Sequence, residues 1–171
     1  MGVAREGAPS FAAAAEAHLD DVHAYLVYLT GDRTMAEELT AETFARACEA
    51  WRRYDPRRGS VKTWLCQLAR STALDHFRAE KRRRAREEAF ALREVRAGPE
   101  HVFGEGLSPR LEAALARLSR GEREVIALRV LLELDGEATA RLLGISSTAC
   151  STRLSRALQK LEAEVRDDVV A

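Results

Sequence analysis

The sequence predicts an all-α protein with two small helical domains: an amino-terminal helical bundle and a carboxy-terminal helix-turn-helix domain. Apolar residues recur at helical spacing, and hardly any run alternates with the period of two that marks strands. Side chains that cap helices stand where these periodic stretches begin. A glycine- and proline-containing stretch at 87–108 divides the 171 residues, so we expect a flexible linker between domains at 8–86 and 109–171.

Three helices are expected in the amino-terminal domain. Thr34 and Glu37 have the spacing of a capping box, which would start the second of them near Met35. Pro56 and Gly59 place a turn-rich loop before the third helix. The expected helices cover about 11–29, 35–51 and 61–86.

The carboxy-terminal domain is expected to contain a helix-turn-helix. Ser119 and Glu122 form a second capping box. Asp135 then caps a short helix, Gly144 supplies the turn and Ser146 caps the last helix. This last helix has an apolar side and a side of short polar groups, a combination that suits the major groove of DNA. The apolar side comprises Cys150, Leu154, Ala157, Leu158, Leu161 and Val165, and the polar side comprises Ser147, Thr148, Ser151, Thr152, Ser155 and Arg156.

Charge is strongly segregated along the chain, although the net charge is zero. Residues 51–86 carry 12 basic and three acidic side chains, a net charge of +9. Such a block favours a nucleic-acid partner, because neutralising phosphates releases counterions. Aromatic residues are interleaved with these arginines, which favours nucleic acid over a solvated helical face: Trp51, Tyr54, Trp64 and Phe77. Trp51 and Trp64 are better interpreted as core residues, since large aromatic side chains usually fill interiors.

No enzyme site, cofactor or metal site is expected. Cys48, Cys66 and Cys150 lie far apart in helical patterns, so we interpret all three as small buried hydrophobic residues. The four histidines do not fall at ligand spacing, and neither a nucleophile–base motif nor a glycine-rich phosphate loop is present. No apolar run is long enough to span a bilayer or to form a signal peptide, so a cytoplasmic protein without membrane insertion is expected.

Four motifs, in the right order and spacing, resemble those of bacterial RNA polymerase sigma factors of the sigma-70 superfamily. Residues 36–44 (AEELTAETF) resemble AEDLxQETF, and residues 54–65 (YDPRRGSVKTWL) resemble FDPxxGxFxxWL. Residues 68–78 (LARSTALDHFR) are similar to IARNxAxDxLR, and residues 118–125 (LSRGEREV) resemble LPxxxREV. The short chain, with two domains and a bare linker, resembles the extracytoplasmic function (ECF) group.

The resemblance implies a factor that binds core RNA polymerase, directs it to specific promoters and assists strand opening, without a small-molecule substrate. It also implies an anti-sigma protein as a regulatory partner. It assigns polymerase binding to Glu37, Glu38, Leu39, Glu42 and Phe44, and minus-ten DNA binding to Arg57, Arg58, Lys62, Arg70, Ser71, Asp75 and Arg78. Minus-thirty-five DNA binding falls to Ser147, Thr148, Ser151, Thr152, Arg153, Ser155 and Arg156.

Three positions depart from the family's usual residues. Ala41 replaces a glutamine, Ser71 stands where asparagine is common, and Ser151 replaces a lysine or arginine. Ala41 bears on the polymerase contact, and Ser71 predicts an atypical minus-ten base preference. Because Ser151 leaves the last helix with fewer cations than is usual, we expect weaker or altered recognition of the minus-thirty-five element.

Two alternative functions would place the chain in other classes of protein. A stand-alone helix-turn-helix regulator would bind duplex DNA by itself, usually as a symmetric dimer on two half-sites. An adaptor would use the same helices only for protein contacts.

Overall fold

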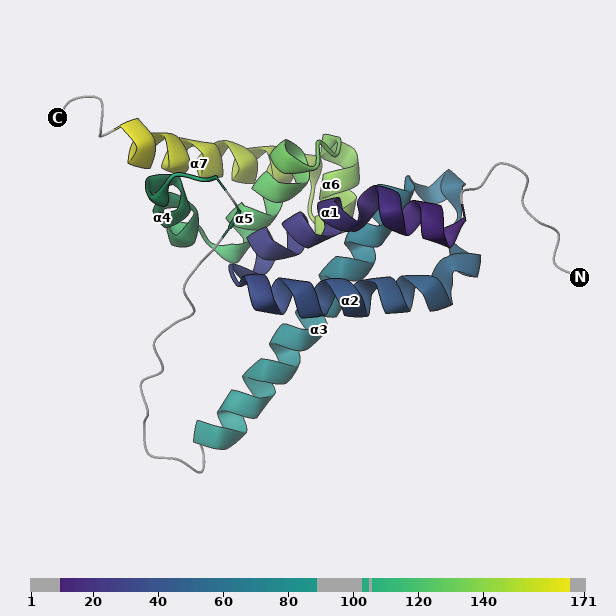
Figure 1. Ribbon diagram of the computed structural model, residues 1–171. Coiled ribbons are helices and arrows are strands. Elements are labelled where there is room, and N and C mark those ends of the chain that lie inside the picture. The colour runs from purple at the N-terminus through teal and green to yellow at the C-terminus, as the bar shows by residue number, and fades with distance from the viewer. Residues whose placement is uncertain (1–9, 89–102, 105, 167–171) are drawn as a thin grey trace, which may run out of the picture.

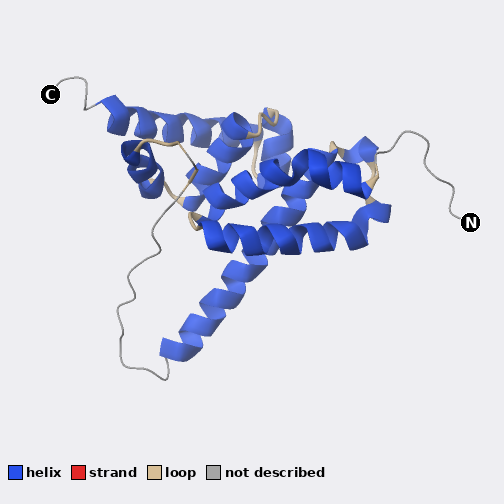
Figure 2. Cartoon of the chain, viewed as in Figure 1, coloured by secondary structure: helices blue, strands red, loops and turns tan. Residues whose placement is uncertain are grey.

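All regular elements in the described residues, which are 10–88, 103–104 and 106–166 of a computed structural model, are helical (Figure 2). The all-α prediction is thereby confirmed. The amino-terminal part holds α1 (Phe11–Thr30), α2 (Arg33–Ala50), 3-10 turns at Trp51–Arg53 and Pro56–Arg58, and α3 (Val61–Glu88). The carboxy-terminal part holds α4 (Pro109–Arg117), α5 (Arg120–Ile126), a π-helical segment (Ala127–Leu131), α6 (Gly136–Leu143) and α7 (Ser147–Arg166). Most of the expected linker at 87–108 lies outside the described residues.

The first two helices are bounded by local hydrogen bonds. Ser10 caps α1 by accepting a hydrogen bond from the backbone of Ala13, and Gly31 ends α1 with a left-handed φ of 68°. α2 begins at Arg33, because the Asp32 carboxylate accepts from the backbone N–H of Met35 at 3.0 Å. The predicted capping box at Thr34 is therefore wrong, since Asp32 takes the capping position two residues earlier.

Helix α3 has two dissimilar halves. Its first half packs against α1 and α2, with Leu65, Ala69 and Ala73 fully buried. Its second half projects away from the other helices (Figure 1), and residues 81–86 are all exposed. This second half carries six of the twelve basic side chains of the block, and Glu80 pairs there with two neighbouring arginines.

An aromatic cluster holds the loop between α2 and α3. The Trp51 and Tyr54 rings stack at 5.4 Å between centroids, and Trp64 meets Trp51 edge-on at 5.7 Å. The Tyr54 hydroxyl donates to the backbone carbonyl of Gly59 at 3.1 Å. Both tryptophans thus act as structural residues, as predicted.

The helix-turn-helix forms as predicted. Ser119 and Glu122 make the capping box of α5, and Asp135 caps α6 by accepting from the backbone of Ala138. Gly144 makes the turn with a φ of 67°, and Ser146 caps α7 by accepting from the backbone of Ala149 at 3.1 Å. The π-helical segment between α5 and α6 was not predicted.

Two predicted burial patterns are wrong in part. Cys150 and Ala157 on α7 are buried, but Leu158 and Val165 are 42% and 45% exposed because they lie at the edge of the packed stripe. Cys48 is exposed on the outer side of α2, whereas Cys66 and Cys150 are buried as expected.

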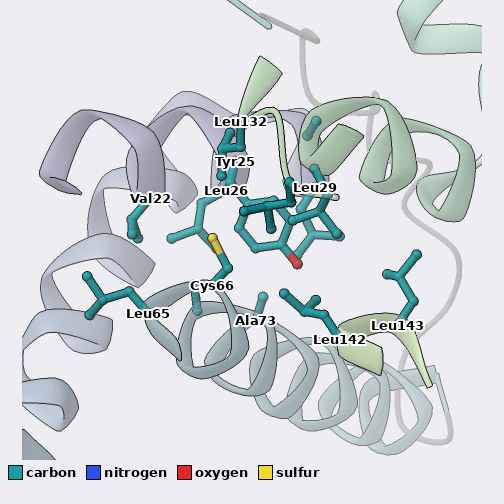
Figure 3. Packing of buried hydrophobic residues seen from close by; sticks show 14 of the residues in the cluster. Val22, Tyr25, Leu26, Leu29, Leu65, Cys66, Ala73, Leu132, Leu142 and Leu143 are labelled. Atoms are coloured by element: carbon teal, nitrogen blue, oxygen red, sulfur yellow. The ribbon is translucent and has the colours of Figure 1, made fainter. Parts of the chain in front are cut away.

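One apolar core joins the two parts of the chain. Tyr25, Leu26 and Leu29 of α1 and Leu65 of α3 pack in the same cluster as residues from α5, the π-helical segment and α6 (Figure 3). The residues contributed by the carboxy-terminal part are Val125, Ala127, Leu128, Leu132, Leu134, Ala140, Leu142, Leu143 and Cys150. A second cluster, containing Phe103, Leu115, Leu118, Ile126 and Ala157, completes the carboxy-terminal part. The two sets of helices therefore pack directly against each other.

Candidate nucleic-acid and protein interfaces

The outer face of α2 is acidic, as predicted. Glu37, Glu38 and Glu42 are exposed because the opposite side of α2 faces α1 and α3. Leu39 is only 2% exposed, and Phe44 is half-buried against the core. Of the five residues predicted for polymerase binding, the structure thus brings the three carboxylates to one surface and places the two apolar side chains beneath it.

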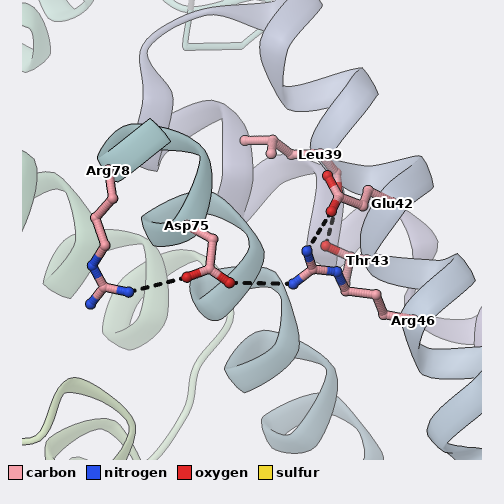
Figure 4. Close-up of polar contacts among 6 residues, drawn as sticks. All are labelled: Leu39, Glu42, Thr43, Arg46, Asp75 and Arg78. Carbon is pink, nitrogen blue, oxygen red and sulfur yellow. Dashed lines mark hydrogen bonds and ion pairs between the residues drawn. The ribbon is translucent and has the colours of Figure 1, made fainter. Parts of the chain in front are cut away.

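A chain of ion pairs runs from this acidic face to α3 (Figure 4). The Arg46 guanidinium donates to Glu42 at 2.6 Å and to the Asp75 carboxylate at 3.5 Å. Asp75 also accepts from Arg78 at 3.1 Å. These side chains are 42% to 65% exposed, so each pair contributes only about 0–1 kcal/mol and can exchange for another partner.

The loop before α3 presents two arginines. Arg57 and Arg58 lie in the 3-10 turn that Asp55 caps, and both are exposed. Gly59 follows with a φ of 150°, in a region that favours glycine, and its carbonyl is held by the Tyr54 hydroxyl. The aromatic cluster therefore fixes a short basic turn beside the start of α3.

Lys62 and Arg70 are the two predicted minus-ten residues that are half-buried. The Lys62 ammonium pairs with the Asp21 carboxylate of α1 at 2.9 Å and donates to the Leu132 carbonyl at 3.5 Å. Arg70 donates through Nε to the Glu124 carboxylate of α5 at 2.8 Å. The other five residues, Arg57, Arg58, Ser71, Asp75 and Arg78, are exposed.

Glu124 lies at the centre of the contact between the two parts. It is 5% exposed, and the same carboxylate oxygen that pairs with Arg70 accepts a hydrogen bond from the Tyr25 hydroxyl at 2.8 Å. Burial, followed by the neighbouring Glu124 charge, raises the pKa of Tyr25 well above its usual value. The phenol therefore stays protonated and donates.

Arg123 makes a second polar contact between the parts. Its guanidinium donates to the Tyr28 carbonyl of α1 at 3.0 Å and to the Leu118 carbonyl at 2.7 Å. Arg123 is 7% exposed, and burial, more than the nearby Arg120 charge, lowers its pKa. No signal in the sequence indicated that Glu124 would bind Tyr25 or that Arg123 would bind the Tyr28 carbonyl, because a capping pattern or a helical period says nothing about distant partners.

The polar face of α7 is exposed over its whole predicted length. Ser147, Thr148, Ser151, Thr152, Ser155 and Arg156 are all exposed. Arg153 is half-buried, and its guanidinium lies against Gly121 at the start of α5. Six of the seven predicted minus-thirty-five residues thus share one accessible surface, while Arg153 turns toward the domain interior.

Within the described ranges, no group of three histidine, cysteine or acidic side chains could hold a metal ion. None of the helices described is both long and apolar enough to cross a membrane.

The helix-turn-helix and the basic helix α3 define a helical protein of the DNA-binding class. The family model Sigma-70 region 2 matches residues 14–83, and the model Sigma-70, region 4 matches residues 108–161. The chain belongs to the ECF RNA polymerase sigma factors. This membership does not favour the alternative of a regulator that acts without polymerase.

Named relatives support the same family. The chain is 32% identical to the ECF RNA polymerase sigma factor BldN of Streptomyces coelicolor over 94% of its own length, and it spans 62% of BldN. It is 30% identical to a probable RNA polymerase sigma-C factor of Mycobacterium bovis, over 86% of this chain and 79% of that protein. The fold is similar to that of the sigma factor RpoE of Bartonella quintana, solved in complex with the anti-sigma factor NepR. For that structure the TM-score is 0.76 at 22% identity, with 92% of this chain and 98% of that chain covered.

Proposed function

We propose that this chain binds core RNA polymerase, directs it to specific promoters and assists strand opening at initiation. The observation that carries the proposal is the order of three surfaces along one sigma-type chain. An acidic face on α2 is followed by a basic turn and helix α3, and then by the polar face of α7. We assign the first two surfaces to a domain at 8–86 and the third to a domain at 109–171.

The acidic face of α2 is the proposed polymerase contact. Glu37, Glu38 and Glu42 supply exposed negative charge, which would mainly speed and orient assembly with a basic partner surface. Leu39 and Phe44 would act from beneath, by holding the helix in position.

The basic turn and α3 are the proposed minus-ten contact. Extruding a base from the duplex costs a few kcal/mol, and stacking on a side chain can recover about 1–3 kcal/mol per base. Arg57 and Arg58 can pair with phosphates, while Ser71, Asp75 and Arg78 line the next turns of α3. Lys62 and Arg70 would join them after exchanging their present partners.

The polar face of α7 is the proposed minus-thirty-five contact. Arg156 can bind a guanine through two hydrogen bonds, and the serine and threonine hydroxyls can accept or donate to bases or phosphates. Arg153 would support the helix from its position against Gly121.

An anti-sigma protein is the proposed regulatory partner. The support is the solved structure of similar fold, whose sigma factor is bound to an anti-sigma factor.

Run-off transcription with purified core polymerase on fragments of the source genome tests the proposal. We expect defined transcript starts that require the added chain. Glu38→Lys on the acidic face should reduce both polymerase binding and transcript yield, whereas Glu49→Lys, exposed near the end of the same helix, is the matched control. Tight binding to a duplex operator without polymerase, together with no transcript, would instead support a stand-alone regulator.

A further inference from the structure

We propose that Arg46 is a positioning residue for minus-ten recognition, because its guanidinium holds the Asp75 carboxylate in place on the proposed minus-ten surface of α3. This inference rests on the proposed function, in which Asp75 and Arg78 contact the promoter. Arg46 itself lies on α2, between the acidic face and α3 (Figure 4).

The Arg46 guanidinium bridges two carboxylates from different helices. One terminal nitrogen, Nη2, donates to Glu42 on the preceding turn of α2 at 2.6 Å. The other, Nη1, donates across to Asp75 on α3 at 3.5 Å. Because the short bond within α2 anchors the planar guanidinium, its second donor is directed at Asp75.

Asp75 is held through both of its carboxylate oxygens. Oδ2 accepts from Arg46, and Oδ1 accepts from Arg78 on the next turn of α3 at 3.1 Å. A carboxylate with one partner can still rotate about its side-chain bonds, whereas partners on two helices fix its orientation. Asp75 therefore has a defined direction before any DNA binds.

The two partners of Asp75 differ in how readily they can turn to DNA. Arg78 is 65% exposed and lies three residues from Asp75 on the same helix, so a phosphate can draw its guanidinium away at little cost. Arg46 is 42% exposed and is anchored by Glu42. When Arg78 turns to a phosphate, Arg46 stays on Asp75 and keeps the carboxylate oriented.

The orientation of Asp75 matters because a carboxylate only accepts hydrogen bonds. On a base edge it can accept from the amino group of cytosine or adenine, but it repels a phosphate. Arg46 supplies a positive charge that reduces this repulsion, and it leaves the outer side of the carboxylate for a base. Arg46 thereby influences base preference without touching the base itself.

A simple brace between α2 and α3 is the alternative role for Arg46. Exposed ion pairs contribute little to stability, so such a brace adds little. The two helices are already joined by buried residues of one cluster: Leu39 and Ala47 from α2, and Leu65 and Ala69 from α3. Removing the Arg46 guanidinium should therefore leave the fold intact.

The test compares Arg46→Met with Arg33→Met in holoenzyme made from the full-length chain and core polymerase. Arg33 is the matched control, because it is 45% exposed on the same helix and pairs with Glu37 at the same spacing of four residues. The probe is a promoter located by run-off transcription, prepared with each of the four bases at every minus-ten position. Competition between these promoters gives the relative affinity for each base.

Arg46→Met should bind core polymerase as the wild type does and bind the preferred promoter about fivefold more weakly. It should also lose most of the preference for an amino-bearing base at one minus-ten position. Arg33→Met should match the wild type in both measurements. An unchanged base preference in Arg46→Met overturns the inference even if the overall affinity falls, because a brace or a non-specific charge would produce that result.

A double-mutant cycle with Asp75→Asn separates positioning from direct contact. If Arg46 acts through Asp75, adding Arg46→Met to Asp75→Asn should cause no further loss of base discrimination. Additive losses would show that Arg46 contacts the DNA itself, and they would overturn the inference.

Arg46→Lys provides a second variant if circular dichroism shows that Arg46→Met does not fold. Lysine keeps the charge but lacks the planar fork that bonds both carboxylates, so the same loss of preference is expected at smaller size. A wild-type base preference in Arg46→Lys counts against the inference. Run-off transcription by the wild type separates the two hypotheses: no transcript at all contradicts the proposed function, whereas normal transcription without these shifts in the variants contradicts only the role of Arg46.

Discussion

The two surfaces proposed to contact DNA differ in what covers them. On α7, the serine and threonine side chains and Arg156 are exposed, and no residue described in the amino-terminal part forms a hydrogen bond or ion pair with them. On α3, Lys62, Arg70 and Phe77 already contact the carboxy-terminal part. One surface is ready for a ligand, while the other must first exchange partners.

Side-chain chemistry explains this difference. Short hydroxyl side chains on α7 stay close to their own helix and offer little to a neighbouring domain. Arginine and lysine on α3 are long, charged and hydrogen-bond donors only, so they find carboxylates and carbonyls in whatever packs beside them. A basic DNA-binding helix is therefore more readily masked within its own chain than a hydroxyl-rich one.

The largest expected effect comes from breaking the core that joins the two parts. Leu128 in the π-helical segment is fully buried in the shared cluster, so Leu128→Ala should lower the free energy of unfolding by about 2–5 kcal/mol. Urea unfolding followed by tryptophan fluorescence checks this, because both tryptophans, Trp51 and Trp64, lie in the amino-terminal part.

Leu158→Ala is the matched control, since Leu158 is 42% exposed on α7. Its free energy of unfolding should stay within about 0.5 kcal/mol of the wild-type value. An unchanged tryptophan transition in Leu128→Ala would show that the two parts unfold independently, and the comparison between one ready and one masked surface would lose its structural basis.

The next effect concerns the ready surface. Arg156→Ala should cost about 1–3 kcal/mol of holoenzyme binding at the minus-thirty-five element and relax the base preference at one position. Competition binding of holoenzyme on promoters with systematic base changes measures both. Arg117→Ala on α4 is the control, because its side chain is 68% exposed and pairs with Glu164 rather than lying on the polar face. Equal losses in the two variants would show a general charge effect instead of base recognition.

The sequence was sufficient for features that a few neighbouring residues determine. The capping box at Ser119 and Glu122, the Asp135 cap and the left-handed Gly144 all formed where expected, because each depends on groups within four residues. The predicted start of α2 was wrong because Asp32, two residues before Thr34, accepts the capping hydrogen bond from the backbone of Met35. The burial of Leu158 was misjudged because helical period alone does not tell how wide the neighbouring helices are.

The residues of the candidate sites could be predicted from the sequence, but their partners could not. Motif resemblance located the proposed contact residues, and the structure shows most of them at the surface. Their partners were beyond sequence reasoning, since Tyr25 and Glu124 are separated by 99 residues and neither belongs to a periodic pattern that indicates the other. Arg70 is likewise paired with Glu124, which lies 54 residues away in the sequence, so only the packing of the two parts brings them together.

A smaller effect would sharpen the comparison by making α7 more like α3. Ser151→Arg adds a cation to the ready surface, so duplex DNA should bind more tightly and the salt slope should become more negative by about 0.9. Fluorescence anisotropy over a range of salt concentrations measures this, and Ala17→Arg on the exposed side of α1 adds the same charge elsewhere. If Ser151→Arg left both affinity and slope unaltered, α7 would not approach phosphates in the proposed way.

The smallest effect is a pH dependence confined to the carboxy-terminal part. The Lys160 ammonium, which donates to Glu122 at 2.6 Å, is the main reason that the pKa of Glu122 lies below its usual value of 4.5, and the backbone and side chain of Ser119 add to it. A carboxylate with a lowered folded-state pKa stabilises the fold above the unfolded pKa and loses this contribution as pH falls through the folded one. The urea midpoint should therefore begin to fall below about pH 4.5.

Lys160→Met separates this contribution from other acid effects, because it removes the ammonium and keeps an apolar chain of similar length. The midpoint of Lys160→Met should lie slightly below that of the wild type near neutral pH, and the two should converge as the solution becomes acidic. Glu124, two residues further along α5, points away from Glu122 and binds Tyr25 and Arg70 instead, so Tyr25→Phe should leave the gap between the two curves intact. If the curves stayed parallel at all pH values, the Lys160–Glu122 pair would contribute nothing in the folded state, and the start of α5 would be held by the Ser119 cap alone.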